Sequence, residues 1–165
     1  MKKPTLLPVM VLIAMLSFSC STDSLDETAE NTTTNIVVPE TKVIEIEIVE
    51  LINDYRLSIG LNPLNNMKLI KSQAYSHTDY MIEHDNVSHD NFYQRKTYLI
   101  NNAGANKVSE NVAYGFTTAQ SVVNAWLNSP GHRENIEGDF TDFDISAEQN
   151  SQGKWYYTNI FVKKK

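Results

Sequence analysis

The chain has 165 residues, of which 41% are hydrophobic, and this length suits one globular domain with some accessory sequence. Its formal net charge of −6 makes it a poor candidate for binding nucleic acid or for adhering to anionic lipid by charge. Cys20 is the only cysteine, so the chain can form no internal disulfide.

The N-terminus has the pattern of an export signal. Two lysines, Lys2 and Lys3, precede the apolar run Leu6–Leu16, which is too short to span a bilayer comfortably. The following "SFSC" resembles a bacterial lipobox. We therefore predict that residues 1–19 are a lipoprotein signal peptide and that Cys20 carries lipid, which would anchor the protein to a membrane without spanning it. Removing the two lysines takes the net charge from −6 to −8.

A polar segment separates this signal from the domain. "STDSLDETAENTTTNIVVPE" is rich in Ser, Thr, Asn and acids and has little to bury. It predicts a flexible tether over residues 20–40, followed by a domain over residues 41–165. Acidic residues soon after the cysteine resemble surface-export signals of some Gram-negative lipoproteins. The expected location is extracytoplasmic and membrane-anchored, in the periplasm or on the cell surface of a Gram-negative bacterium.

Two helices are predicted in the first half of the domain. Apolar residues from Ile48 to Tyr55 follow helical spacing, and Gly60 is a natural stop. The β-branched start, Val43–Ile48, alternates with Glu and predicts that this helix begins late. After a turn at "LNPL", a second helix is predicted over roughly Met67–His84.

The second half mixes short helices with strands. "FYQRKTYLI" predicts a short helix, "NNAGAN" a turn, and "SENVAYG" a short strand. "TTAQSVVNAWLNS" predicts a helix capped by Thr117 or Thr118, and "PGHRENIEG" predicts a tight turn with at most one helical turn. "DFTDFDISAEQ" and "KWYYTNIFVK" predict an antiparallel hairpin closed by "NSQG". Helices that do not alternate strictly with strands indicate an α+β fold.

Six motifs occur in order and resemble one family. They are "LINDYRLSIGLNPL", "AYSHTDYM", "VSHDN", "SENVAYG", "VVNAWLNSPGHRENI" and "KWYYTNIF". Together they resemble the CAP superfamily of cysteine-rich secretory, antigen 5 and pathogenesis-related proteins, also called the SCP domain, in its bacterial, disulfide-free branch. The resemblance covers about Val43–Phe161. It implies an α-β-α three-layer sandwich with a central antiparallel sheet.

The resemblance also implies a cavity. Animal and plant members carry two His and two Glu there, which bind divalent metal in some of them. The matching positions are His89 in "SH", Glu110 in "EN" and His132 in "GH". The second Glu usually follows the Trp of the helix, but Asn128 or Ser129 stands there in this chain.

Three interpretations of this cavity remain open. Two imidazoles and a carboxylate can hold Zn²⁺ or another divalent metal, with His89 and His132 as the metal ligands. The same trio can transfer protons, with Glu110 as the candidate catalytic base. Otherwise the three side chains form a polar hydrogen-bond cluster that fixes the surrounding loops.

Other polar and aromatic residues are expected to serve the fold. We expect His77 to be buried or to support the cavity, and His84 to interact with the C-terminal dipole of its helix. Trp126 is expected in the core. Arg133 and Asn135 are expected to satisfy carbonyls of the turn that contains them.

The motifs exclude several enzyme classes and leave two main functions. G-x-S-x-G, a P-loop, a dinucleotide fingerprint and H-E-x-x-H are all absent from the sequence. The first hypothesis is a lipid-anchored binding or interaction module whose ligand is a lipid, a small hydrophobic molecule or a protein partner. The alternative is a metal-assisted hydrolase, a peptidase or cell-wall enzyme, that uses His89, Glu110 and His132. A third hypothesis is a spacer domain on a lipoprotein.

Overall fold

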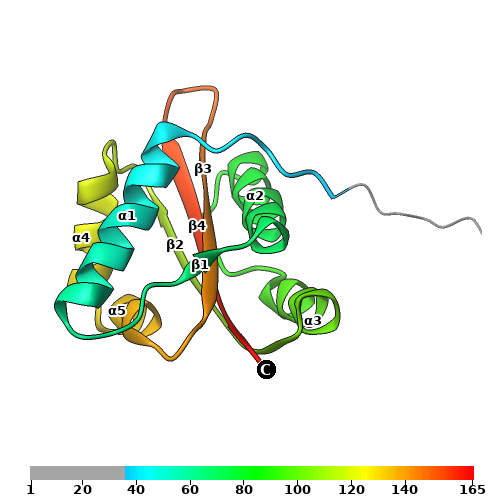
Figure 1. Ribbon diagram of the computed structural model, residues 1–165. Coiled ribbons are helices and arrows are strands. Elements are labelled where there is room, and N and C mark those ends of the chain that lie inside the picture. Colours follow the sequence, from blue (N-terminus) through cyan, green and yellow to red (C-terminus); the bar gives the residue numbers. More distant parts are fainter. Residues whose placement is uncertain (1–35) are drawn as a thin grey trace, which may run out of the picture. The chain divides into compact units, whose positions relative to one another are not determined.

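A four-stranded sheet lies between two layers of helices in the computed structural model, which describes residues 36–165 (Figure 1). The predicted α-β-α sandwich is therefore confirmed. The predicted signal peptide 1–19, the lipid site Cys20 and the tether up to residue 35 lie outside the described residues. The predictions for that part of the chain stay predictions.

The sheet is antiparallel in its three long strands. The strand order is β1-β3-β4-β2, and both β2 and β3 pair with β4 in antiparallel register. The predicted hairpin is confirmed as β3 and β4. The sequence did not predict β1, a two-residue strand that pairs in parallel with the start of β3 and makes the sheet mixed. The strands are β1 (Asn65–Asn66), β2 (Ala105–Tyr114), β3 (Asp142–Gln149) and β4 (Trp155–Lys164).

One face of the sheet carries three helices. They are α1 (Val43–Ser58), α4 (Ala119–Asn128) and α5 (Pro130–Glu137). Trp126 is 1% exposed and packs in the core beneath them, as predicted. The largest side chains that share this core are Phe140, Phe143, Tyr157 and Phe161.

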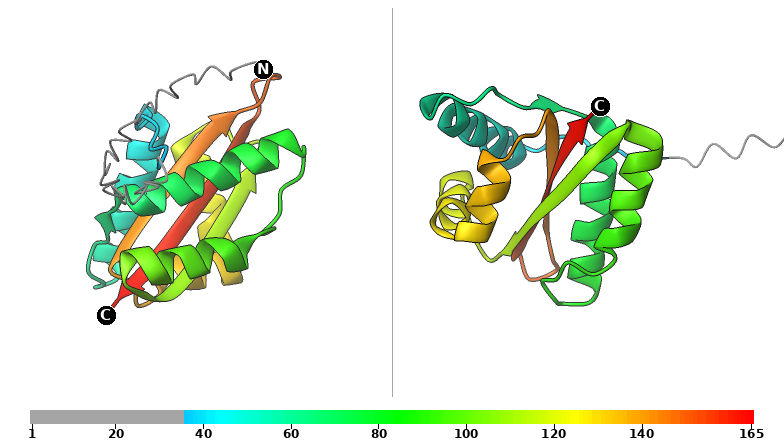
Figure 2. Two further views of the ribbon diagram at one scale, coloured as in Figure 1. Left: turned by 90° about the vertical axis from the view of Figure 1, so that its right-hand side faces the viewer. Right: turned by 90° about the horizontal axis from the view of Figure 1, so that it is seen from below.

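The other face carries two helices. In Figure 2 the view from below shows α2 (Lys68–Glu83) and α3 (Phe92–Ala103) on the side opposite to α1, α4 and α5. Tyr156 packs on this side and Tyr157 on the other, so the two side chains point to opposite faces of β4. The core on this side includes Ile70, Ala74, Leu99, Ile160 and Val162.

Several element boundaries differ from the predictions for identifiable reasons. Helix α1 begins at Val43 and not later, because the Glu45 carboxylate accepts the Lys42 amide and caps the first turn (2.7 Å). Helix α3 runs to Ala103, where Gly104 ends it at a φ of 67°. The segment "PGHRENIE" forms an eight-residue helix, α5, which is longer than the single helical turn expected, with Pro130 in its first turn.

Candidate functional site

Glu110 lies at the edge of the sheet. It belongs to β2, which is the last strand in the order, and it faces α2 and α3 because its neighbours on that face, Val108 and Val112, pack against those helices. Glu110 is only 6% exposed. A buried carboxylate at this position needs partners, because removing a charge from water is costly.

Two side chains supply these partners. Arg95 of α3 makes a bidentate pair, with Nε 2.9 Å from Oε2 and Nη2 2.9 Å from Oε1 of Glu110. His89 donates from Nδ1 to Oε1 of Glu110, also at 2.9 Å. Burial opposes ionisation, but the hydrogen bonds from His89 and Arg95 outweigh it and hold the pKa of Glu110 below its ordinary value. Glu110 is therefore an ionised carboxylate whose two oxygens are both engaged.

His89 presents its other nitrogen to solvent. Its side chain is 53% exposed, and because Nδ1 is bonded to Glu110, Nε2 is the ring nitrogen that Glu110 does not engage. Arg95 also holds the loop that carries His89, because its Nη1 donates to the Asp90 carbonyl at 2.7 Å. The carboxylate and the guanidinium thus orient an exposed imidazole.

His77 supports this cluster from α2. Its Nε2 donates to the Ser88 carbonyl at 2.8 Å and lies 3.8 Å from Oε1 of Glu110. The residue is 2% exposed, and burial lowers its pKa, so the ring is neutral at pH 7. The predicted buried, supporting role of His77 is confirmed.

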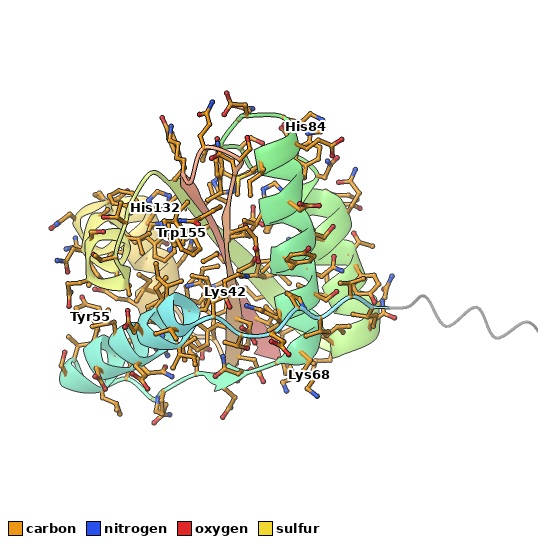
Figure 3. All side chains as sticks on the ribbon, turned by 90° about the horizontal axis from the view of Figure 1, so that it is seen from above. Lys42, Tyr55, Lys68, His84, His132 and Trp155 are labelled. Atoms are coloured by element: carbon orange, nitrogen blue, oxygen red, sulfur yellow. The ribbon has the colours of Figure 1, made fainter. Side chains whose placement is uncertain are left out.

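His132 approaches from the opposite face of the sheet. It lies in the first turn of α5, and in Figure 3 it is on the side that α4 and α5 cover, whereas His84 lies beside the end of α2. The amide of Asn111, the residue after Glu110, donates to the His132 carbonyl at 2.9 Å. Adjacent strand residues point to opposite faces, so Glu110 and Asn111 connect β2 to both helical layers.

The imidazole of His132 carries an unused polar atom. Its Nδ1 is buried and has no hydrogen-bond partner among the described residues. Burial, and secondarily the charge of His89, lower the pKa of His132.

The three predicted site residues are therefore only partly brought together. His89 and Glu110 are in direct contact, but no hydrogen bond or ion pair joins His132 to either of them within residues 36–165. Asn128, which occupies the region of the family's second acid, is exposed at the end of α4. Within the same range no group of three or more His, Cys, Asp or Glu side chains is arranged to hold a metal ion.

The sequence-based interpretation missed Arg95. The signal was present: Arg95 lies four residues before Leu99 and eight before Ala103, on the buried face of α3. An arginine at an inward-facing position needs a buried anion, and Glu110 is that anion. Asn135 was expected to satisfy carbonyls of its own turn, but its amide donates instead to β2, to the Glu110 carbonyl at 3.3 Å and to the Asn111 side chain at 2.8 Å.

A family model and two bacterial relatives match this chain. The model of the cysteine-rich secretory protein family (CAP) matches residues 49–162. The uncharacterized protein YkwD of Bacillus subtilis is 34% identical over 145 residues, which are 83% of this chain and 54% of that protein. The uncharacterized membrane protein YlbC of the same bacterium is 28% identical over 73% of this chain and 34% of its own length. The chain thus spans about half the length of YkwD and about a third of the length of YlbC.

Solved structures share the fold. An outer surface protein of Borrelia burgdorferi superposes with a TM-score of 0.69 at 24% identity, over 77% of this chain and 97% of that one. An extracellular SCP-domain protein of Bacillus anthracis superposes with a TM-score of 0.64 at 25% identity, over 73% of this chain and 40% of that one. The relatives include extracellular, surface and membrane proteins. No helix in the described part of this chain is long and apolar enough to cross a membrane.

Proposed function

Because the chain belongs to the cysteine-rich secretory protein family, we propose that it is an extracytoplasmic, lipid-anchored CAP domain that acts as a binding or interaction module. The extracellular and surface relatives support the location. The proposed anchor is lipid on Cys20, and the proposed setting is the periplasm or the cell surface of a Gram-negative bacterium. The ligand class is a lipid, a small hydrophobic molecule or a protein partner.

One observation carries the choice of binding over catalysis: the bidentate pair between Arg95 and Glu110. A general base needs a free oxygen and a pKa near the working pH. Glu110 has neither, since both oxygens accept hydrogen bonds and its pKa is lowered. Its contacts suit a residue that positions His89, which is the partner exposed to a ligand.

Three imidazole nitrogens at this edge have no hydrogen-bond partner among the described residues. They are Nε2 of His89, whose side chain is 53% exposed, and the buried Nδ1 atoms of His77 and His132. A neutral imidazole can accept a hydrogen bond from a hydroxyl or amide group. The proposed ligand therefore brings a polar group to the β2 edge, with its remaining surface in contact with the surrounding loops.

The alternative function is a metal-assisted hydrolase, and the unpartnered Nδ1 of His132 is the observation that favours it. Zn²⁺ or another divalent metal would be held by His89 and His132, and it would supply Lewis-acid chemistry. A catalytic zinc site ordinarily has three protein ligands, and the described residues supply no such group. The described residues therefore do not form a three-ligand catalytic zinc centre.

A calorimetric Zn²⁺ titration separates the two functions. The wild-type protein, a His89→Ala/His132→Ala double variant and a His84→Ala control should be compared. Under the proposed function, the dissociation constant of wild type for Zn²⁺ is micromolar or weaker, and wild type hydrolyses no peptide or peptidoglycan. Tight binding that is lost only in the double variant, together with metal-dependent hydrolysis by wild type, would replace the proposal with the alternative.

The anchor is tested separately. Mass spectrometry of the mature N-terminus should find an acylated Cys20 as the first residue, and a Cys20→Ala variant should leave the membrane fraction. If the Cys20→Ala protein still partitions fully with membranes, the lipid-anchor part of the proposal is wrong. The domain's binding role is independent of that result.

A further inference from the structure

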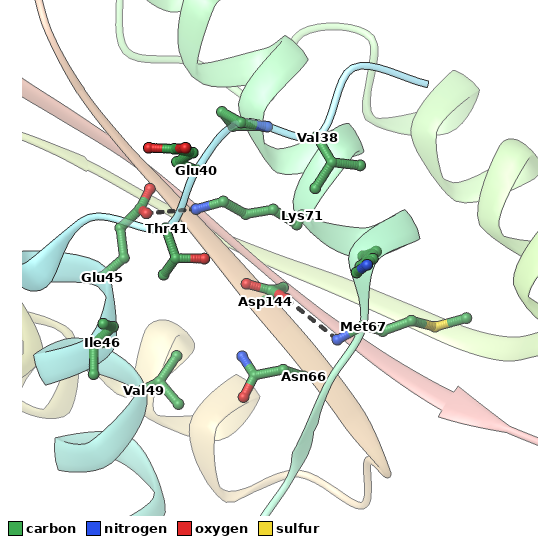
Figure 4. Close-up of a pocket in the computed structure, with 12 residues that line it drawn as sticks. Val38, Glu40, Thr41, Glu45, Ile46, Val49, Asn66, Met67, Lys71 and Asp144 are labelled. Carbon is green, nitrogen blue, oxygen red and sulfur yellow. Dashed lines mark hydrogen bonds and ion pairs between the residues drawn. The ribbon is translucent and has the colours of Figure 1, made fainter. Parts of the chain in front are cut away.

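A second cavity lies at the other edge of the sheet, away from Glu110. It has a volume of about 740 Å³ and opens between the start of α1, the start of α2 and β3 (Figure 4). Strand β1 pairs only with Asp142 and Phe143, so β3 has no neighbouring strand on this side from Asp144 onward. The side walls are mainly apolar and include Val38, Ile46, Val49 and Met67.

Charged side chains form the floor of this cavity. Glu45 is 0% exposed, Lys71 is 2% exposed and Asp144 is 8% exposed. Nζ of Lys71 lies 2.6 Å from Oε2 of Glu45 and donates to the Ile145 carbonyl at 2.7 Å. The buried ammonium is therefore paired with Glu45, and Figure 4 shows this ion pair as a dashed line.

Asp144 has no cation of its own. It accepts hydrogen bonds from the amides of Ile145 (2.9 Å) and Met67 (3.2 Å). Neither Lys71 nor any other Lys or Arg among the described residues makes an ion pair with it. Burial raises the pKa of this carboxyl above its ordinary value, against the opposing effects of those amides, of Lys71 and of a hydrogen bond from the Asn66 side chain.

The lining has one negative charge in excess. Glu40 and Lys68, both exposed, face the cavity at its rim and offset each other. On the floor, two carboxylates face one ammonium group. Buried charges in proteins are ordinarily paired, so a ligand that adds one positive charge beside Asp144 would complete the set.

We propose that this cavity binds an aliphatic ammonium group, with its nitrogen at Asp144 and its methylene chain against the apolar walls. An ammonium group is compact and carries up to three donors, which suits a carboxylate whose present donors, two backbone amides and the Asn66 side chain, are all neutral. An anion would meet the excess negative charge. A metal ion would lack ligands, because the described residues contain no cluster of three or more ligating side chains. The same chemistry is found in a free diamine and in a lysine side chain of a partner.

The test uses cadaverine, 1,5-diaminopentane, titrated calorimetrically into the domain. Wild type should bind it saturably, and Asp144→Asn should weaken binding at least about tenfold, since the charge is lost while the shape is retained. The matched control, Asp54→Asn, removes an exposed acid from α1 and should leave the affinity unchanged. 1-Pentanol, which has the same chain without the charge, should not bind.

Three results would overturn the proposal. They are the absence of saturable binding at millimolar cadaverine, equal affinity of wild type and Asp144→Asn, and equal binding of 1-pentanol. If circular dichroism shows that Asp144→Asn does not fold, the pH dependence of cadaverine binding by wild type tests the proposal instead. Its affinity should fall as the pH is lowered from about 7 to about 4, because protons compete for Asp144. A constant affinity over that range would also contradict the proposal.

A second arm identifies the source of the ammonium group. The peptide acetyl-Gly-Lys-Gly-amide should be titrated beside cadaverine. Tighter binding of the peptide assigns the cavity to a protein partner's lysine, and tighter binding of cadaverine assigns it to free diamines. Either result supports the proposal if Asp144→Asn weakens the tighter of the two ligands.

Discussion

The two edges of the sheet each bury a glutamate against a cation from a helix, but they use the pair differently. At the β2 edge Arg95 binds Glu110, and at the β3 edge Lys71 binds Glu45. The Glu45 and Lys71 side chains also bind the backbone of β3, since Glu45 accepts the Ala147 amide (2.8 Å) and Lys71 donates to the Ile145 carbonyl (2.7 Å).

This difference separates a structural pair from a site. Exposed strand edges offer unpaired backbone groups to other chains, and charged side chains that bind those groups protect the edge. Glu45 and Lys71 do this for β3. At the β2 edge, in contrast, Glu110 receives only side-chain donors and holds an exposed His89 in place. A buried ion pair alone thus does not identify a functional site, whereas the partners of its remaining hydrogen bonds do.

The largest expected effect comes from breaking the pair at the β3 edge. Lys71→Met leaves Glu45 buried without a cation and frees the Ile145 carbonyl, and it should destabilise the domain by about 3–5 kcal/mol. Urea denaturation followed by circular dichroism measures this. Lys68→Met, an exposed control on the same helix, should change the free energy of unfolding by less than about 0.5 kcal/mol. Equal effects of the two variants would refute the structural role of the pair.

The matching change at the β2 edge should cost less. Arg95→Met leaves Glu110 with the His89 donor and close to the sheet edge, so we expect a loss of about 2–3 kcal/mol. It should also raise the pKa of Glu110. Arg95→Lys, which keeps the charge but loses the bidentate geometry, should recover only part of the stability. The same urea titrations test this, and a larger loss than that of Lys71→Met would reverse the order of the two edges.

Both pairs leave a trace in the sequence that helical periodicity can detect. Glu45 precedes Ile48 and Ile52 by three and seven residues, on the buried face of α1. Arg95 occupies the equivalent inward position before Leu99 on α3. Charges at inward positions predict buried ion pairs. They do not predict which charges meet, because each partner comes from a distant segment and is set by the packing of the layers.

The family resemblance groups His89, Glu110 and His132, and the structure joins the first two directly but reaches His132 only through Asn111. Glu110 and Asn111 are neighbours in sequence and face opposite helical layers, so "EN" contacts His89 through one residue and His132 through the other. Local spacing cannot show which layer covers which face of a strand. The same limit hid the cavity at β3, where residues from α1, α2 and β3 converge.

The two edges should also respond to pH with opposite signs. The pKa of Glu110 is lowered from 4.5, so its contribution to stability is present above pH 4.5 and is lost as the pH falls through the folded-state value. The pKa of Asp144 is raised from 3.8, so its contribution is present below pH 3.8 and is lost as the pH rises through the folded-state value.

Two neutral variants make this contrast measurable. Urea denaturation from about pH 3 to about pH 8 should show Glu110→Gln losing stability relative to wild type as the pH rises. Asp144→Asn should gain stability relative to wild type as the pH rises over the same range. Both changes are expected to be smaller than those of Lys71→Met and Arg95→Met. If the stability of both variants relative to wild type changed in the same direction with pH, the opposite pKa shifts of Glu110 and Asp144 would be contradicted.

The smallest expected effect concerns His132. Burial, with a secondary contribution from His89, lowers its pKa from 6.5, so the folded protein resists protonation of this ring. Wild type should therefore lose stability relative to His132→Asn only as the pH falls below 6.5, and the two should run in parallel above it. The difference should be a few tenths of a kcal/mol, because the ring is only partly buried and water screens its charge. His89→Asn should reduce this pH dependence without abolishing it, since burial is the main cause. If His89→Asn leaves the dependence unchanged, the two imidazoles do not share a site at the β2 edge.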